Sequence, residues 1–310
     1  MALLEILLIV FGLALFEIII SVDNAIINAE VLSTTSKKAR KWFLLWGFII
    51  AVFLVRGLLP LIILWANNPS LGFVGSFVAS FSANPETAKA IEESAPILLI
   101  GGGTFLVFLF FHWLFLEPKH YGLKGEALIQ KHGVWFFAVV SVVLAAIVWF
   151  SIKINPLMAF GAVVGSTAFF ITHGFKENAE QAEKNMIEGS SHMSDLSKIL
   201  YLEVIDATFS IDGVLGAFAF TFSIPLILIG NGIGAFVVRE LTISNIERVK
   251  RYKYLKNGAM YSIFALGIVM LSDSFGFHIP SWFSPVLTFI VVGFFFYKSV
   301  KELKSQEKAQ

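Results

Sequence analysis

The sequence predicts an all-α, polytopic transmembrane helix bundle of about nine helices with an inverted structural repeat. Three observations predict it. Of the 310 residues, 57% are hydrophobic and 15% are charged, and Phe occurs 33 times, which is more apolar surface than a soluble core can hide. The apolar residues fall into runs of roughly 20, the length of a helix that crosses a bilayer, whereas barrel strands would alternate. An acidic motif also occurs twice in the chain.

The predicted spans divide the chain into three parts. Residues 1–116 form a first repeat of three helices, residues 117–198 hold two intervening helices and a cytoplasmic linker, and residues 199–310 form a second, inverted repeat with a final helix and a cytoplasmic tail. The first span is a retained helix, because no basic stretch precedes it and no small-residue cleavage site follows it. The predicted spans cover residues 3–30, 42–65, 96–116, 133–152, 156–175, 199–221, 224–240, 257–275 and 283–300.

Basic residues orient the bundle, because Lys and Arg concentrate in cytoplasmic loops. One basic loop, at residues 37–41, follows the first span, and another, at 248–256, follows the seventh. The N-terminus is then outside and the C-terminus cytoplasmic, in a multi-pass protein of a bacterial-type cell (inner) membrane. We expect residues 66–95 to form an acidic external loop. We expect residues 176–198 to form a solvated linker helix, with a cation-collecting antechamber as the alternative.

Cysteine content and net charge narrow the chemistry. The chain has no cysteine, which removes disulfides, thiolate metal ligands and a Cys nucleophile together. The formal net charge of +1 gives no indication of a nucleic-acid partner, and none is expected. The lipid bilayer is the expected surrounding, and the oligomeric state stays open.

The acidic motif is part of an internal repeat. Residues 17–25 and residues 206–214 both contain an acid, a Ser four positions later and an Asp six positions later. The match continues in the following helix, where a Gly precedes Arg56 and another precedes Arg239 by nine residues. The copies begin at the first and sixth spans, so they run through the membrane in opposite directions. Inverted repeats of this kind place the working site near mid-membrane, between the copies, and support alternating access.

Polar residues follow one face of the first and of the sixth predicted helix. The two stripes contain Glu17, Ser21, Asn24 and Asn28, and Glu203, Asp206, Ser210 and Gly213. Asp23 and Asp212 lie about 120° away from these stripes on an ideal helix. Because Asn24 and Gly213 follow them and tolerate irregular backbone, we predict local unwinding there, which would free backbone carbonyls as cation ligands.

These residues are typical of a site for a hard cation. An ionised carboxylate at mid-bilayer costs at least about 2.5 kcal/mol, so several of them need a cation or protons. Carboxylate, amide and hydroxyl oxygens suit Mn²⁺, Ca²⁺ or Mg²⁺, whereas zinc or copper would usually show Cys or clustered His, and the 6 His are scattered. The predicted metal ligands are Glu17, Asp23, Asn24, Glu203, Asp206 and Asp212, supported by Ser21, Asn28, Ser210, Arg56 and Arg239.

Several of these residues have a second interpretation. The acids could pair with Arg56 and Arg239, or hydrogen-bond between helices for packing alone. Two roles are possible for Arg56: it anchors the helix by extending outward to the interface, or it neutralises an acid when the cation has left. We expect the three glycines at 101–103 to permit close helix packing rather than to form a flexible gate. The lone His173 is expected at the membrane interface, with a ligand or a proton relay as the alternative.

The acidic motifs resemble those of the TerC family of membrane proteins, most closely a branch labelled as a domain of unknown function. The resemblance covers about residues 1–115 and 199–275. It implies membership of the LysE-like exporters, an association with tellurium resistance by name and, for several relatives, manganese efflux. By position, the first family motif matches Glu17, Asp23 and Asn24, and the second matches Glu203, Asp206 and Asp212. Gly213 departs from the pattern, because relatives often carry Ser there, and this leaves the ion and its stoichiometry open.

We therefore expect a secondary transporter that moves a divalent metal cation, with Mn²⁺ efflux from the cytoplasm favoured, and no enzymatic activity. Proton coupling fits this function, because carboxylates relieved of a metal take up protons in an apolar site. A second hypothesis is a non-transporting membrane assembly or stress-response factor with a structural or sensing cation site and a partner on residues 176–198. A third, an intramembrane hydrolase using Asp23 and Asp212, lacks a second enzymatic signature.

Overall fold

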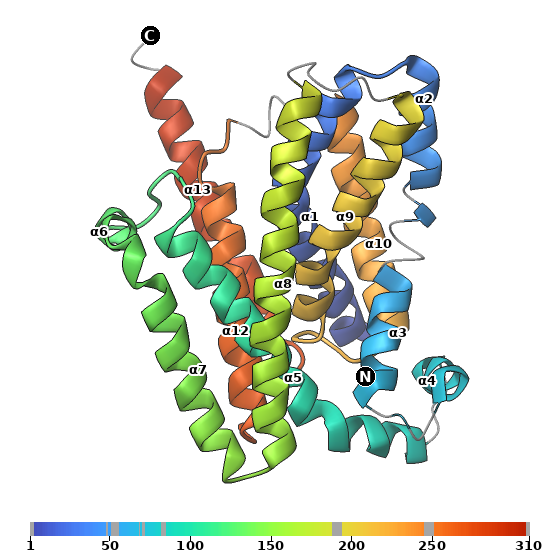
Figure 1. The fold of residues 1–310 in the computed structure, drawn as a ribbon, viewed down its shortest axis with the longest axis vertical. Coiled ribbons are helices and arrows are strands. Elements are labelled where there is room, and N and C mark those ends of the chain that lie inside the picture. The colour runs from blue at the N-terminus through green and yellow to red at the C-terminus, as the bar shows by residue number, and fades with distance from the viewer. Residues whose placement is uncertain are drawn as a thin grey trace.

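The fold is helical throughout the described part of the chain (Figure 1). The computed structural model describes residues 3–47, 49–50, 56–67, 69, 72–81, 85–187, 194–244 and 251–307, and within these helices some side chains, including those of Asp23 and Asn24, lie outside the description. The elements are α1 Leu3–Ser33, α2 Lys37–Trp42, a π-helical turn Phe43–Gly47, α3 Arg56–Asn67, α4 Gly72–Phe81, α5 Pro85–Phe115, α6 Glu126–Lys131, a 3₁₀ turn Gly133–Trp135, α7 Phe136–Ile152, α8 Pro156–Ile187, α9 Asp195–Ala217, α10 Ile224–Ser244, α12 Leu255–Ser274 and α13 Phe283–Glu307.

Helix length and hydropathy are consistent with a multi-pass membrane protein. Six of the described segments are long and apolar enough to cross a bilayer: Leu3–Val22, Glu93–Phe115, Gly133–Ile152, Pro156–Asn178, Leu255–Ser274 and Phe283–Gln306. The sixth predicted span, which is now α9, is not among them. Its charged residues Glu203, Asp206 and Asp212 explain this, because each lowers the mean hydropathy of the helix.

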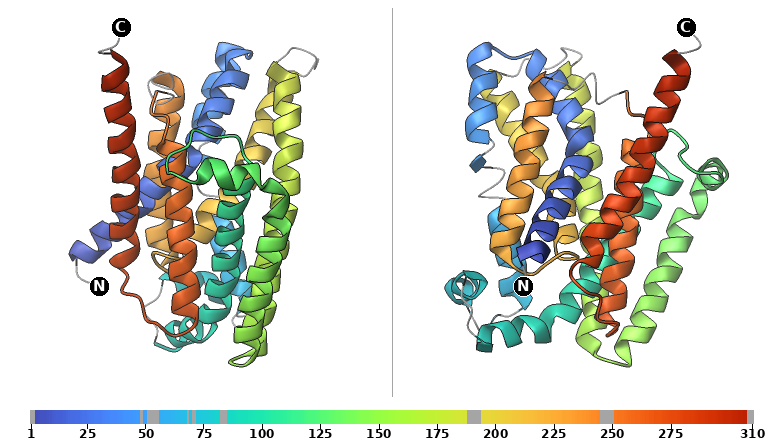
Figure 2. Two further views of the ribbon diagram at one scale, coloured as in Figure 1. Left: turned by 90° about the vertical axis from the view of Figure 1, so that its left-hand side faces the viewer. Right: turned by 180° about the vertical axis from the view of Figure 1, so that it is seen from behind.

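Most of the long helices run roughly along the long axis of the molecule, whereas α4, α6 and the first turns of α5 lie across it (Figures 1 and 2). α1 packs along α10, α5 packs between α8 and α12, α7 lies against α8, and α13 lies against α12. α9 contacts α1, α3, α5 and α8, and so occupies the middle of the bundle. The C-terminus and α2 lie toward one end of the long axis, and the N-terminus lies toward the other end (Figure 1).

Glycines bring α5 close to two neighbouring helices. A Cβ atom on Gly101 would lie 2.9 Å from the carbonyl oxygen of Gly161 in α8, and one on Gly103 would lie 3.0 Å from that of Gly267 in α12. A Cβ on Gly102 would meet the side chain of Met270. α5 is a continuous helix through these residues, so the prediction of close packing at 101–103 is confirmed.

The predicted unwinding at residues 23–24 and 212–213 is wrong. α1 continues without a break from Leu3 to Ser33, and α9 continues from Asp195 to Ala217. One glycine inside a helix costs only about 1 kcal/mol, and packing can outweigh that cost. Gly213 indeed lies against Ile20 and Glu17 of α1, so the close approach of two helices, rather than an irregular backbone, accounts for a glycine at this position.

The segment predicted as an external loop, residues 66–95, also differs. It contains α4, Gly72–Phe81, and the first turns of α5, which begins at Pro85. Pro is favoured at the first helical position and an acidic residue in the first turn, so Pro85 followed by Glu86 is a helix start that the polar residues of the first turns of α5 concealed. The span predicted at 42–65 consists of the π-helical turn and α3 in the described residues, while positions 48 and 51–55 lie outside them.

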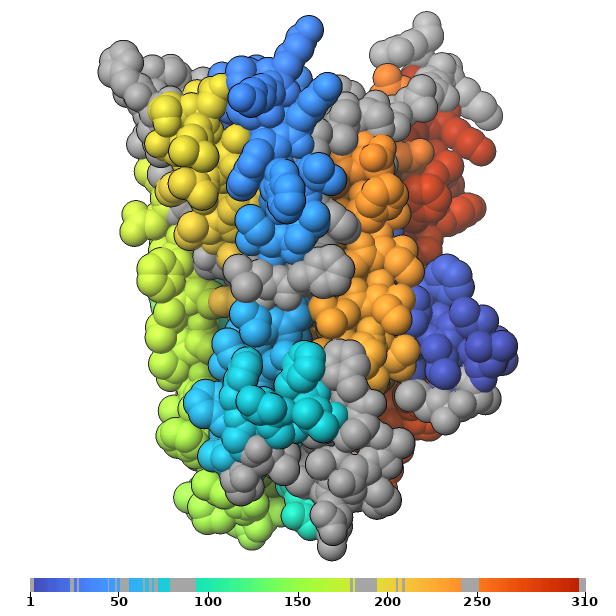
Figure 3. Space-filling view, turned by 90° about the vertical axis from the view of Figure 1, so that its right-hand side faces the viewer, coloured from blue at the N-terminus to red at the C-terminus, as the bar shows by residue number. Residues whose placement is uncertain are grey.

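α2, α3 and α4 lie on one face of the molecule between α9 and α10 (Figure 3). This position matters because α9 and α10 form, with α1, the walls around the buried polar residues. The π-helical turn and α3 therefore close the polar interior of the bundle on that face. α8 extends to Ile187, so the first half of the segment predicted as a linker helix is helical.

Candidate functional site

A buried ion pair joins α1 to α3. The Glu17 side chain is 1% exposed, and its Oε1 lies 2.6 Å from Nη2 of Arg56, whose side chain is 5% exposed. The Ser21 hydroxyl, one turn further along α1, donates to the same carboxylate oxygen at 2.8 Å. Because charge-assisted hydrogen bonds are strong in a low-dielectric interior, this pair fixes the carboxylate and the guanidinium together.

Two helices leave room for the Glu17 carboxylate. A Cβ on Gly213 of α9 would lie 3.1 Å from Oε2 of Glu17, and a Cβ on Gly234 of α10 would lie 2.6 Å from its Cβ. Any larger side chain at either position would push against Glu17. The two glycines therefore permit α1, α9 and α10 to converge on this carboxylate.

A second arginine lies at the other side of the site. Arg239 of α10 donates through Nη1 to the carbonyl oxygen of Phe43 in the π-helical turn, and its guanidinium lies 4.6 Å from the centre of the Phe43 ring. Its Nη2 is 3.8 Å from Oε1 of Glu203 and 3.9 Å from Oδ2 of Asp206, both in α9. These distances exceed hydrogen-bonding range, so Arg239 balances the charge of the two acids without binding either of them closely.

The carboxylate of Glu203 is incompletely satisfied. Both of its carboxylate oxygens are buried and have no hydrogen-bond partner. A Cβ on Gly47 would lie 1.7 Å from one of these oxygens, so the carboxylate packs directly against the π-helical turn. A buried carboxylate without donors is costly, and either a proton or a cation would relieve that cost.

The polar residues of α1, α9 and α10 surround a small cavity. Its volume is about 20 Å³, enough for one body the size of a water molecule or a bare ion. The lining residues are Glu17, Ser21, Ala25, Asn28, Phe43, Arg56, Asp206, Ala235, Val238 and Arg239. The structure thus brings together most of the predicted site from both halves of the chain, and Glu203 adjoins it through Arg239.

Two predicted residues behave differently from this group. Asp212 lines a separate hollow together with Thr172, His173 and Lys176 of α8, on the side of α9 that faces α5 and α8. Ser210 donates its hydroxyl to the backbone oxygen of Asp206 at 2.7 Å, so its own helix satisfies it. Asp23 and Asn24 lie outside the described side chains, and their place relative to the cavity stays a prediction.

Sequence reasoning missed Phe43, which contributes a carbonyl oxygen and an aromatic face to Arg239. No motif marks it, because its role arises from a π-helical turn. The partner of His173 was missed as well: its ring lies 3.9 Å, centre to centre, from that of His112 in α5. Spacing could not have shown this contact, since α5 and α8 are distant in sequence.

The described acids are not arranged as a metal centre. Among the described side chains, no group of three or more His, Asp or Glu residues could hold a metal ion. Guanidinium groups lie beside the acids: Arg56 contacts the carboxylate of Glu17, and Arg239 lies near both Glu203 and Asp206. Among the described side chains, three carboxylates and two guanidinium groups therefore share this interior, which leaves one negative charge in excess when all of them are ionised.

Comparison with known proteins places the chain in a family. Residues 22–306 match the family described as "Protein of unknown function (DUF475)". The chain belongs to this family. No curated protein and no solved structure matches the chain.

Proposed function

We propose that this DUF475 protein is a secondary transporter of a divalent metal cation, with Mn²⁺ efflux from the cytoplasm as the favoured activity. The observation that carries the proposal is the Glu203 carboxylate, which is buried without a hydrogen-bond partner beside a cavity lined by Glu17 and Asp206. Intramembrane acids mark ion pathways when nothing else accounts for their cost. Carboxylate and hydroxyl oxygens are ligands for hard cations, and the motif resemblance to TerC proteins favours Mn²⁺.

The two arginines provide counter-charges for a carrier that must return without its cargo. With the cation gone, Arg56 binds Glu17 and Arg239 balances Glu203 and Asp206, as in the described arrangement. An entering cation would displace these guanidinium groups from the acids. The resulting competition lowers the affinity for the cation, and a transporter needs a site that both binds and releases it.

The contacts between the two halves support an inverted repeat. Gly234 of α10 lies against Glu17 of α1, and Gly47 of the turn before α3 lies against Glu203 of α9. In each case the helix that follows one acidic helix packs on the acidic helix of the other half. We infer a pseudo-two-fold relation between the halves, with the cavity between them and alternating access as the mechanism.

Metal flux into liposomes tests the function. We expect saturable uptake of Mn²⁺ by the purified full chain, with Ca²⁺ and Mg²⁺ as competing candidates. The Glu203→Gln and Asp206→Asn variants should lower that flux at least about tenfold. Glu177→Gln is the matched control, because its carboxylate lies on α8 and is 72% exposed. Leakage that is the same with and without protein, or full flux in both site variants, would contradict the proposal.

A second function is favoured by one observation, the close pairing of Glu17 with Arg56 at 2.6 Å. If the acids serve only to hold helices together, the chain is a non-transporting membrane assembly or stress-response factor. Absence of flux, combined with loss of folding in the variants, would support that alternative. Retained folding with lost flux would support the transporter.

A further inference from the structure

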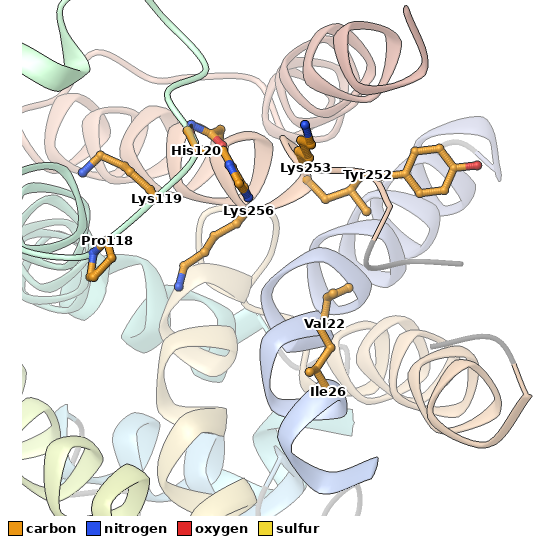
Figure 4. A pocket seen from close by; sticks show the side chains of 10 residues that line it. Val22, Ile26, Pro118, Lys119, His120, Tyr252, Lys253 and Lys256 are labelled. Carbon is orange, nitrogen blue, oxygen red and sulfur yellow. Dashed lines mark hydrogen bonds between the residues drawn. The ribbon is translucent and has the colours of Figure 1, made fainter. Parts of the chain in front are cut away.

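A larger hollow lies beside another face of α1 than the face that lines the cavity of the buried acids. Its volume is about 460 Å³, within the usual range for small-molecule sites. It is lined by Val22, Ile26, Pro118, Lys119, His120, Tyr252, Lys253, Leu255, Lys256 and Asn257. Figure 4 shows Lys119 and Lys256 on one side of this hollow and Val22 and Ile26 of α1 on the other.

Charge in this hollow has one sign. Among the described lining residues, every charged side chain is basic, and the three lysines come from two segments, the connection after α5 and the start of α12. Glu117 and Glu302 pair with Lys256 and Lys253, each at 2.9 Å, but neither acid lines the hollow. These two acids offset the charges of Lys256 and Lys253, so a bound anion would share the two lysines with them.

The depth of the hollow is set by the ends of three candidate membrane spans. Leu3–Val22 and Glu93–Phe115 end beside it, and Leu255–Ser274 begins in it. The first turn of α12 adds a positive dipole end and the backbone N–H groups of Lys256 and Asn257, whereas the N–H of Leu255 donates to the carbonyl oxygen of Tyr252. Lys253 and Lys256 therefore lie at the start of one of these spans, and Val22 and Ile26 give the wall of the hollow an apolar part.

We propose that this hollow binds a phosphate-bearing anion, through Lys253, Lys256 and the start of α12. The lysines are compact charges that bind phosphate, and basic pockets between transmembrane helices recognise anionic headgroups. Lys119 has a different part: its Nζ donates to the carbonyl oxygens of Trp113 and Leu114 at 2.6 and 2.7 Å, so it holds the end of α5 in place. An anionic phospholipid and a soluble phosphate ester are the two sources of such a group.

Thermal unfolding of the purified full chain in detergent tests this proposal. The additives are phosphatidylglycerol, phosphatidylcholine and glycerol 1-phosphate, each titrated separately. We expect phosphatidylglycerol to raise the unfolding temperature at lower concentration than phosphatidylcholine does. The Lys253→Gln, Lys256→Gln double variant should bind phosphatidylglycerol about thirtyfold more weakly. A response to glycerol 1-phosphate that the double variant also loses would show that the phosphate group alone is recognised, and a response to the lipid only would assign the site to the bilayer.

Two further variants keep the test decisive. Lys124→Gln, Lys131→Gln removes the same charge from two exposed lysines that lie outside the hollow, and it should bind as the parent does. Lys253→Arg, Lys256→Arg keeps the charge and should retain binding, even if the glutamine variant folds poorly. Equal binding of phosphatidylglycerol and phosphatidylcholine by the parent, or a glutamine variant that folds and binds as the parent does, would overturn the proposal.

Discussion

Glu17 and Arg56 form the closest charge pair in the described interior, and each depends on the other for its place in a low-dielectric region. Removing one partner of a buried pair leaves the other charge uncompensated, at a cost of about 3–5 kcal/mol. We therefore expect Glu17→Gln and Arg56→Gln to lower the free energy of unfolding by amounts of that order. The double variant should be more stable than either single variant, because it leaves no isolated charge.

The measurement is a double-mutant cycle on unfolding in mixed micelles. Arg251→Gln serves as the control, since Arg251 is exposed and should tolerate the change. If the losses of unfolding free energy in the two single variants add up to the loss in the double variant, Glu17 and Arg56 are not energetically coupled. The ion pair would then not be what stabilises Glu17 in the interior.

Glu117 provides a pH-dependent contact outside the membrane spans. Burial alone would raise the pKa of its carboxyl group, but the contact with His112, whose Nδ1 lies 3.4 Å from Oε1, and the charges of Lys256 and Lys176 outweigh burial and hold the pKa below its usual range. A depressed pKa in the folded state contributes stability above the unfolded value of about 4.3, and that stability is lost as the pH falls. Glu117→Gln should therefore cost about 1–2 kcal/mol at pH 7.

The unfolding temperatures of parent and variant, compared between pH 7 and pH 3, check this sign. The difference should narrow as the pH falls below about 4. Glu177→Gln, which changes a carboxylate that is 72% exposed, should show little difference at any pH. A gap that stays constant over the range would mean that the Glu117 charge is not what stabilises the fold.

At the same scale, periodicity predicted part of the candidate site. Glu17, Ser21 and Asn28 line one cavity because residues four or seven positions apart share a helix face. Periodicity placed Asp212 about 120° from the polar stripe, on another face of α9. It could not show that Asp212 would line a hollow with His173, because that depends on which helix packs against this face. The carbonyl of Phe43 was beyond prediction for a different reason, since backbone groups carry no sequence signal.

At the scale of elements, α5 and α8 cross at backbone contact. A Cβ on Gly165 of α8 would lie 2.0 Å from the carbonyl oxygen of Gly101 in α5, so even one methyl group must move the helices apart. We expect Gly165→Ala to destabilise the protein by about 1–3 kcal/mol. Gly174→Ala, in the same helix, has nothing within 4 Å and should be neutral or stabilising.

Thermal unfolding of both variants in detergent measures this difference. Equal stability of the two variants would mean that α5 and α8 do not approach as closely as described. The comparison is matched, because residue type, helix and substitution are the same and only the neighbouring atoms differ.

Apolar length predicted most of the long helices, since a helix that crosses lipid needs about 20 apolar residues whatever its neighbours are. The prediction was weakest where polar residues and turns interrupt that signal. α4 is apolar but has only 10 residues, too few to cross a bilayer, and the start of α5 is polar, so both were taken for a loop. The unwinding at residues 23–24 and 212–213 was inferred from Asn24 and Gly213, which tolerate an irregular backbone. These residues also fit a regular helix, and both helices continue through them.

At the scale of the whole molecule, the number of crossings decides which loops share a side of the membrane. Lys38 and Lys153 are exposed, and in the structure α2 lies at one end of the bundle while the turn between α7 and α8 lies at the other (Figure 1). The predicted spans at 42–65, 96–116 and 133–152 place them on opposite sides. If only the six candidate spans cross, two crossings separate them and they share a side.

Because the chain has no cysteine, single thiols can be introduced without any background. We expect a membrane-impermeant maleimide to label Lys153→Cys in intact cells, and Lys38→Cys and Lys304→Cys only after permeabilisation. This pattern follows from the basic segment at 37–41, which the positive-inside rule assigns to the cytoplasm. Labelling of Lys38→Cys and Lys153→Cys from the same side would show that residues 42–65 do not cross. The polar cavity would then lie between helices that do not all span the bilayer, and alternating access between two inverted halves would lose its structural basis.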